Sequence, residues 1–202
     1  MATMSRPTRR SRRLPVPTVR SAVRAFGSSV LVSCGLLVRG RLRQPVRQVG
    51  RQLRFADGSC SRVYRETVHY GPPTWQPVLL VVQFQLRLIG RSRLLHALFR
   101  AESIANTPLF AGFPGFRSKL WATDQRTGVY RGVYEWDGAR PAVDYATTLT
   151  ALLRLGSVPG SVKFHVEPGV RRDDFLRDPG LVGSAPPAGP DRWWRLASGM
   201  VA

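Results

Sequence analysis

The clearest pattern in the chain lies between residues 78 and 169, where the spacing of apolar residues switches repeatedly between two periods. Alternation of apolar and polar residues predicts strands, and apolar residues three and four apart predict amphipathic helices. In chain order the segments are a strand at 78–89, a helix at 92–106, strands at 116–123 and 129–136, a helix at 137–156 and a strand at 161–167. This order predicts an α+β fold of the ferredoxin-like βαββαβ type.

Each predicted strand has one apolar side, and both helices have to cover the same face of the sheet. The apolar sides are Val82/Phe84/Leu86/Leu88, Phe116/Leu120/Ala122, Tyr130/Tyr134/Trp136 and Val162/Phe164/Val166. We expect these residues to form one core with the helices. Asp137 is a good N-cap for the second helix, because its side chain can accept hydrogen bonds from free backbone N–H groups.

The opposite face of the predicted sheet carries polar residues and charges of both signs. Either water covers this face, as in many antiparallel sheets, or two copies of the chain press these faces together around a two-fold axis. Trp121 in the middle of the set favours a homodimer. The candidate dimer face consists of Trp121, Lys119, Arg131, Glu135 and His165.

Three further segments flank the ferredoxin-like domain at 78–169. We expect a flexible basic head at 1–18, a basic helix and β-hairpin extension at 19–77, and a Pro/Gly-rich, loosely packed tail at 170–202. Asp57-Gly58 indicates the hairpin, because it is a two-residue turn signal between two strand-like runs. Gly71-Pro72-Pro73 interrupts the pattern and places the main boundary near the start of the domain.

The basic residues are concentrated at the start of the chain. The net charge is +19, and thirteen arginines precede Asp57 without one acidic residue. Such a segment attracts phosphates, but it lacks the interleaved aromatic residues on which nucleic-acid bases stack. Arginine also outnumbers lysine by 29 to 2, which points to a coding bias over the whole chain. We therefore disfavour nucleic acid as a partner.

The apolar run Phe26–Val38 bears on membranes and targeting. It is too short to cross a bilayer, since a span needs about 20 residues. Arginines on both sides favour an alternative, peripheral contact of residues 20–54 with an anionic membrane surface. The residues before Cys34 resemble a bacterial lipoprotein cut site, but the chain continues apolar after it. We expect a cytoplasmic protein, with membrane association or secretion as alternatives.

The sequence contains no pattern typical of a metal or cofactor site. Two cysteines and three histidines cannot supply a spaced four-ligand zinc cluster. A glycine-rich phosphate loop, a GxSxG motif and a Cys/His nucleophile pair are also missing. We therefore expect the protein to work without a metal and without a cofactor.

Five short motifs resemble a family of small monooxygenase-like proteins. They are Ala101-Glu102-Ser103-Ile104, Pro114-Gly115-Phe116, Lys119-Leu120-Trp121, Gly132-Val133-Tyr134 and Ala142-Val143-Asp144-Tyr145. The family belongs to the dimeric α+β barrel superfamily, which includes cofactor-independent monooxygenases of aromatic polyketides and haem-degrading enzymes. The resemblance covers about residues 78–169 and implies a homodimer in which two sheets pack face to face.

The resemblance does not extend to haem degradation. The haem-degrading relatives combine an Asn on the first strand, a Trp at the end of the third strand and a His on the second helix. Trp136 matches that Trp, but the first strand offers Gln83 and Gln85 instead of Asn. The second predicted helix contains no His, so the iron ligand is missing.

Cofactor-free oxygenation needs a dry pocket, a proton acceptor and hydrogen-bond donors directed at a developing oxyanion. In barrels of this type the pocket lies between the sheet and its helices. The candidate pocket residues are therefore Tyr134, Trp136, Tyr145 and His96. Each has a structural alternative, since aromatic residues on an apolar strand face usually belong to the core and His96 lies off the apolar stripe of its helix.

Two functions are compatible with these observations. The protein is either an oxygenase-like enzyme that acts on a bulky apolar or aromatic small molecule, or a non-catalytic dimeric binding or structural module. In the module, its own aromatic side chains fill the space beneath the helices. An open pocket of several hundred cubic ångströms that reaches Tyr134 favours the enzyme.

Overall fold

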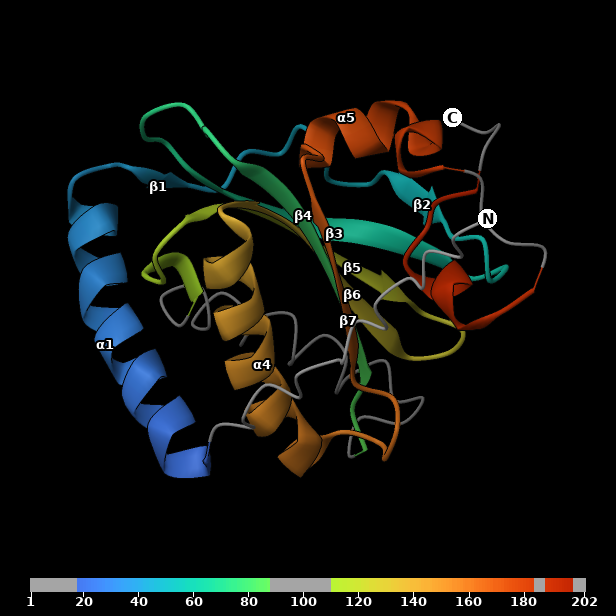
Figure 1. Ribbon diagram of the computed structural model, residues 1–202, viewed down its shortest axis with the longest axis horizontal. Helices are drawn as coiled ribbons and strands as arrows, with labels where there is room; N and C mark the ends of the chain where they lie inside the picture. Colours follow the sequence, from blue (N-terminus) through green and yellow to red (C-terminus); the bar gives the residue numbers. More distant parts are fainter. Residues whose placement is uncertain (1–17, 88–109, 184–187, 198–202) are drawn as a thin grey trace, which may run out of the picture.

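Seven antiparallel strands form one sheet in the computed structural model, which describes residues 18–87, 110–183 and 188–197 (Figure 1). The strands are β1 (Leu42–Arg43), β2 (Gln52–Arg54), β3 (Cys60–His69), β4 (Pro77–Gln85), β5 (Phe116–Asp124), β6 (Val129–Asp137) and β7 (Lys163–Pro168). Their spatial order is β1-β3-β5-β6-β4-β7, and β2 also pairs with β3. Strands β1 to β3, which precede the predicted domain, therefore share one sheet with β4 to β7.

The middle of the sheet is the ferredoxin-like unit. Its strands lie in the order β5-β6-β4-β7, and helix α4 (Ala139–Gly156) connects β6 to β7. The central strand β4 is apolar on both sides from Val78 to Val82, because both faces of the sheet are covered there. The predicted α+β fold of ferredoxin-like type is confirmed. The helix expected at 92–106, with His96, lies outside the described residues.

The segment that precedes the ferredoxin-like unit extends the same sheet. β3 pairs along most of β5. The predicted turn between β2 and β3 is present, and Gly58 has a φ of 85° there, a conformation that favours glycine. Helix α1 (Val19–Val38) lies beside α4 on one face of the sheet (Figure 1). The boundary expected near Gly71 therefore divides a continuous sheet.

A β-bulge lies at the start of β5. Phe116 is paired with Trp136, but Ser118 is paired with Glu135, the very next residue of β6. Arg117 is therefore one extra residue on β5. Because successive side chains of a strand point to opposite faces, one extra residue exchanges the two faces for the rest of the strand.

The bulge corrects the predicted orientation of β5. Lys119 lies opposite Tyr134, so both side chains are on the α4 side of the sheet, and Trp121 shares that side. The assignment of Lys119 and Trp121 to the candidate dimer face is wrong. Leu120 and Ala122, expected beneath the helices, belong to the core on the other face.

The start of α4 also differs from the prediction. Gly138, with a φ of 98°, is the N-cap residue, and Asp137 does not cap the helix. The Asp137 carboxylate instead accepts hydrogen bonds from the backbone N–H of Gln76 at 2.9 Å and from the Arg117 guanidinium at 2.8 Å. Asp137, the last residue of β6, thus binds the bulge residue Arg117 of β5 instead of capping α4.

The C-terminal segment covers the second face of the sheet. It contains α5 (Arg172–Arg177) and the 3₁₀ helices η1 (Pro179–Val182) and η2 (Pro190–Trp193). Phe175, Leu176 and Trp194 are buried in a core cluster with sheet residues. Those sheet residues are Val63, Leu79, Val81, Leu120, Ala122 and Val133. The expectation of a loosely packed tail is therefore wrong for its described part, because most of its large apolar residues complete this core.

The other residues of the candidate dimer face contact parts of the same chain. Arg131 forms an ion pair with Asp57 of the β2–β3 turn at 3.1 Å. Glu135 accepts a hydrogen bond from the first backbone N–H of α5 at 3.1 Å. The ring of His165 stacks on Trp194 with 3.7 Å between centroids. A homodimer stays a prediction, and this face is not free to form it in the described protomer.

Candidate functional site

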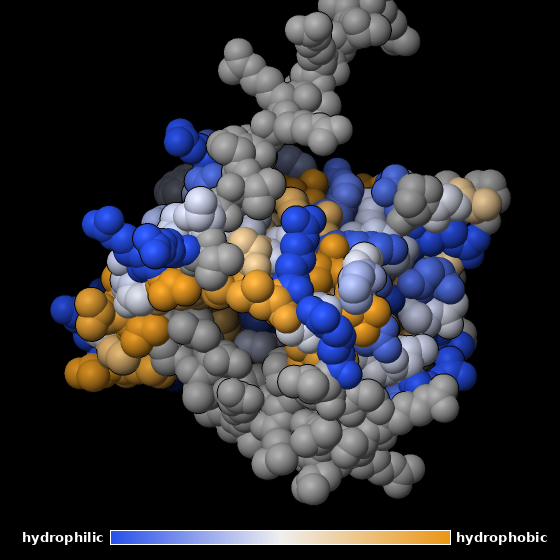
Figure 2. Space-filling model, turned by 90° about the horizontal axis from the view of Figure 1, so that it is seen from below, coloured by the Kyte–Doolittle hydropathy of each residue, from blue (hydrophilic) through white to orange (hydrophobic). Residues whose placement is uncertain are grey.

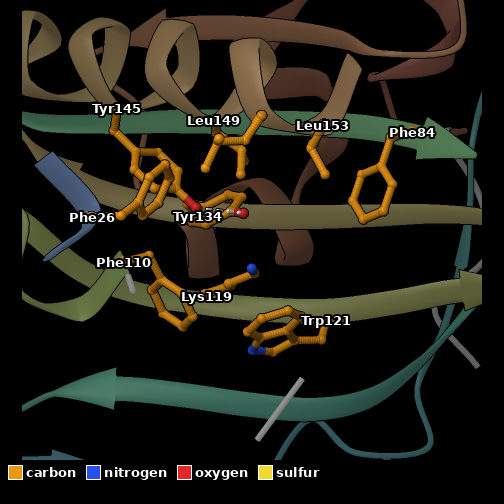
Figure 3. Close-up of a pocket in the computed structure, with 10 residues that line it drawn as sticks. Phe26, Phe84, Phe110, Lys119, Trp121, Tyr134, Tyr145, Leu149 and Leu153 are labelled. Carbon is orange, nitrogen blue, oxygen red and sulfur yellow. Dashed lines mark hydrogen bonds between the residues drawn. The ribbon is translucent and has the colours of Figure 1, made fainter. Parts of the chain in front are cut away.

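A cavity of about 220 Å³ lies on the α4 side of the sheet (Figure 3). Its wall consists of side chains from helices α1 and α4, from strands β4, β5 and β6, and from Phe110, which precedes β5 in the chain. Among the described residues, those that line the cavity are Phe26, Phe84, Phe110, Lys119, Trp121, Tyr134, Tyr145, Leu149, Leu152 and Leu153. The α4-side cavity is therefore an apolar space that contains one primary amine and two phenolic hydroxyls.

Lys119 is the unusual residue of this cavity. It is only 6% exposed. Its Nζ lies 3.0 Å from the ring centroid of Trp121, 4.4 Å from that of Phe110 and 4.8 Å from that of Tyr134. Figure 3 shows the side chain extending from β5 between these rings. Among the described residues, no carboxylate forms an ion pair with its amine.

The electrostatics around Lys119 favour the neutral amine. Burial lowers the pKa of Lys119 well below its usual value, and the positive charge of Arg65 on β3 lowers it further. Contacts with ring faces favour the ammonium by about 2 kcal/mol when the cation is desolvated. They offset only part of the cost, because removing a lone ammonium from water costs several kcal/mol even after the protein relaxes.

Two tyrosines hydrogen bond to each other at the cavity wall. The hydroxyl oxygens of Tyr134 on β6 and Tyr145 on α4 are 3.3 Å apart, and either can be the donor. Burial raises the pKa of both hydroxyls, which therefore stay protonated at neutral pH. Since the pair uses only one of its two hydroxyl protons, the second is available to a molecule in the cavity.

Neighbouring residues hold these groups in place. A Cβ atom at Gly132 would lie 2.5 Å from Cε2 of Tyr134, so the tyrosine ring lies across a backbone position that only glycine leaves open. The indole N–H of Trp121 donates a hydrogen bond to the hydroxyl of Thr67 at 3.3 Å. The positions of the Tyr134 ring and of the Trp121 ring beside Lys119 are thus set by the sheet itself.

Two of the four expected pocket residues, Tyr134 and Tyr145, line the cavity. Trp136 is fully buried with its ring 4.9 Å from that of Tyr145, and it packs in the core behind the lining. His96 lies outside the described residues. The sequence pattern placed Lys119 on the candidate dimer face and not in the pocket, because the bulge at Arg117 does not interrupt the alternation of apolar and polar residues. One signal did exist, since Lys119 is one of two lysines in a chain with 29 arginines.

Comparisons with known proteins give structural neighbours only. No protein-family model matches the chain, and no curated protein matches it. It is similar to a ferredoxin-fold protein from Listeria monocytogenes related to antibiotic biosynthesis monooxygenases, with 14% identity and a TM-score of 0.35. A monooxygenase-like protein from Listeria innocua is similar with 15% identity and a TM-score of 0.35. Both matches cover 54% of this chain and 63% of the other.

A haem-degrading enzyme from Listeria monocytogenes is similar over a larger share of its own length. The identity is 12%, the TM-score is 0.39, and the match covers 62% of this chain and 95% of the enzyme. The chain spans less than two thirds of the two monooxygenase-like neighbours. Likenesses at these TM-scores carry no argument about function, and the fold class rests on the strand order of the chain itself.

Proposed function

We propose that the protein is an enzyme of the cofactor-independent monooxygenase type that acts on a small phenol in the α4-side cavity. The observation that carries this proposal is the amine of Lys119, which is buried without an acidic partner among the described residues and lines the same cavity as the hydrogen-bonded pair Tyr134 and Tyr145. A group of this kind is costly to the fold, and costly perturbed groups concentrate at functional sites.

The cavity volume sets the substrate size. A volume of about 220 Å³ exceeds the roughly 150 Å³ of an engineered cavity that binds benzene. It is smaller than the roughly 300–1,000 Å³ of typical ligand pockets. One or two aromatic rings fit this range better than the bulky substrate expected from the sequence.

Lys119 serves as the proton acceptor in this reaction. The neutral amine takes the phenolic proton, and a tyrosine hydroxyl donates a hydrogen bond to the phenolate oxygen that forms. The phenolate is electron-rich and is itself oxidised by O₂. With α-naphthol, the ring carbon opposite the hydroxyl loses its hydrogen and gains one oxygen atom as a carbonyl. The second oxygen atom leaves as water with that hydrogen and the phenolic proton, and the product is a quinone.

The cavity argues against the alternative of a non-catalytic module. Such a module needs an interior filled by its own aromatic side chains, whereas Tyr134 and Trp121 border open space. The volume of about 220 Å³ is smaller than the several hundred cubic ångströms expected for the enzyme, so the support comes from the position of the open space and not from its size. Haem degradation has no support either, because α4 contains no histidine. Within the described residues, no group of three or more His, Cys, Asp or Glu side chains is placed to hold a metal ion.

Oxygen uptake tests the proposal. The full chain with α-naphthol is expected to consume one O₂ for each molecule of 1,4-naphthoquinone that it forms. Lys119→Met is expected to lower the rate by about 10²- to 10⁴-fold, the usual contribution of a positioned base. Lys163→Met is the matched control, because the only other lysine is exposed on β7. No uptake by the wild type, or equal rates for the two variants, rejects the proposal.

Helix α1 supports a second function, contact with an anionic membrane surface. Leu31 is 77% exposed and Val38 is 89% exposed on this helix. Exposed arginines lie at both of its ends, and no acidic residue precedes Asp57. Figure 2 shows apolar and hydrophilic side chains next to one another at the end of the molecule where α1 lies. In the described part of the chain, no helix has the length and apolarity to cross a bilayer.

Vesicle co-sedimentation tests this contact. We expect binding to phosphatidylserine-containing vesicles, no binding to pure phosphatidylcholine, and release by salt. Exchanging Leu31 and Val38 for Ser is expected to weaken binding about tenfold or more, since each apolar side chain adds about 1.5–3 kcal/mol when buried. Leu155→Ser is the control, because Leu155 is exposed on α4. Equal losses in both variants contradict the assignment to α1.

A further inference from the structure

The amine of Lys119 has a second chemical use that does not involve oxygen. We propose that Lys119 is a nucleophile that forms an imine with small apolar aldehydes and ketones in the α4-side cavity. This inference goes beyond the proposed function, because the nitrogen lone pair forms a bond to carbon instead of accepting a proton. It rests on the same cavity but not on any reaction with O₂.

The position of the amine suits attack on a bound carbonyl group. Lys119 lines the cavity, and its pairing with Tyr134 across the β5–β6 ladder holds its backbone next to the cavity floor. No carboxylate among the described residues binds the amine and keeps it protonated. Among the described residues, the charge that acts on the amine is another cation, Arg65, and it lowers the pKa of Lys119 further.

Proteins activate lysine as a nucleophile in two ways, and both are present here. One is desolvation in an apolar pocket, and the other is a neighbouring positive charge. Lys119 is buried against Phe110 and Trp121. The guanidinium carbon of Arg65 lies 4.1 Å from the ring centroid of the same Trp121. Among the described residues, the other titratable groups that line the cavity are the phenols of Tyr134 and Tyr145, and burial keeps both protonated.

Imine formation balances with the groups that the cavity supplies. The nitrogen of Lys119 attacks the carbonyl carbon, and the carbonyl oxygen takes a proton from the nitrogen to give a carbinolamine. A tyrosine hydroxyl then donates a proton to the departing hydroxyl, which leaves as water. The last proton on nitrogen returns to the tyrosine as the carbon–nitrogen double bond forms. No atom changes its oxidation level overall, so no oxidant or reductant is needed.

The cavity wall also selects the ligand class. The imine is a protonated cation at the moment when water has left, and the ring faces of Phe110, Trp121 and Tyr134 around the nitrogen stabilise that intermediate. The leucines of α4 form an apolar wall for the rest of the ligand. Aromatic aldehydes of one or two rings fit this surface, whereas a charged group placed against the leucines of α4 would lose its hydration there.

Reductive trapping tests the inference on the full chain. Benzaldehyde is added with sodium cyanoborohydride, which converts an imine into a stable benzylamine, and the labelled residue is located by mass spectrometry. Lys163, exposed on β7, is the internal control. At neutral pH we expect Lys119 to be labelled at least about 10-fold faster, because the neutral fraction of an amine grows about tenfold for each unit by which its pKa falls.

Two further arms link the label to the cavity. An excess of α-naphthol, which has no carbonyl group, is expected to slow labelling of Lys119 and to leave Lys163 unchanged. Tyr134→Phe is expected to slow labelling of Lys119 only, because it removes a proton donor for the departing water. A folded chain that is labelled at Lys163 or at its N-terminal amine but not at Lys119 overturns the inference.

Oxygen uptake by the same sample separates this inference from the proposed function. Trapping at Lys119 without turnover of phenols supports the nucleophile and rejects the oxygenase. Turnover of phenols without trapping at Lys119 supports the oxygenase and rejects the nucleophile. The two readouts therefore fail independently, although both depend on one amine.

Discussion

The two faces of the central sheet bury charged side chains in opposite ways. Under the C-terminal segment, Arg131 is paired with Asp57 at 3.1 Å, and Arg172 is paired with Glu66 at 2.7 Å. Under α4, the amine of Lys119 meets aromatic rings and a cavity instead. Pairing recovers part of the cost of removing a charge from water, so paired charges serve the fold. The amine of Lys119 has no acidic partner among the described residues, and its ring contacts offset only part of the cost of burial, which points to chemistry.

The face under the C-terminal segment is tightly packed, whereas the α4 side contains open space. The C-terminal segment places Phe175 and Trp194 directly into the core of its face. On the α4 side, the side chains leave about 220 Å³ open next to the tyrosine pair. Open space forgoes the dispersion contacts that a filled core makes. The α4 side of the sheet thus contains both the buried amine of Lys119 and an unfilled cavity, and the two together support a ligand site there.

Breaking an ion pair of the covered face is expected to have the largest effect on stability. Arg172→Met leaves Glu66 buried without its cation, which costs about 3–5 kcal/mol. Urea denaturation measures the loss. Arg177→Met, which removes an exposed partner of Asp174, is the control and should cost no more than about 1 kcal/mol. Similar losses in both variants would show that the pairing under the C-terminal segment is unimportant for the fold.

Replacing the amine of the other face is expected to act in the opposite direction. Lys119→Met exchanges a costly buried amine for an apolar side chain, and it is expected to stabilise the fold because it removes a desolvation penalty that amounts to several kcal/mol for a buried ion. The same variant should lose phenol turnover and aldehyde trapping. Lys163→Met should change neither stability nor chemistry. A clear destabilisation by Lys119→Met would mean that the amine contributes to the fold.

The pH dependence of stability sharpens this prediction. Folding lowers the pKa of Lys119, so between the folded value and about 10.4 the unfolded chain binds more protons than the folded chain. The free energy of unfolding of the wild type should therefore rise with pH across this window, and the gain is lost as pH falls through the folded pKa. Urea midpoints from neutral pH to about pH 10 should show this rise in Lys163→Met and not in Lys119→Met.

The tyrosine pair is expected to give the smallest change in stability. Tyr134→Phe removes the hydrogen bond to Tyr145, at a cost of about 1 kcal/mol. Tyr70→Phe is a suitable control because Tyr70 is half exposed. Thermal unfolding measures both variants. A loss well above that of one hydrogen bond would indicate that the hydroxyl also holds the packing around the cavity.

Much of the ferredoxin-like unit was predictable because strand and helix periods depend on residues that are close in sequence. The two strands β5 and β6 begin at the predicted residues, and α4 ends at the predicted Gly156. Tyr134 and Tyr145 were expected at a pocket and do line the cavity. The N-cap was predicted wrongly, because Asp137 has partners from β4 and β5 that a local pattern does not reveal.

The sequence by itself determined the order of the four strands of the ferredoxin-like unit and of α4, and it placed Tyr134 and Tyr145 between the sheet and α4. Only the tertiary structure decided that Lys119 faces the cavity, because the bulge at Arg117 exists only through the pairing of β5 with β6. The tertiary structure also decided that the C-terminal segment covers the second face of the sheet. That covering depends on contacts such as His165 with Trp194, between residues whose proximity no local period encodes.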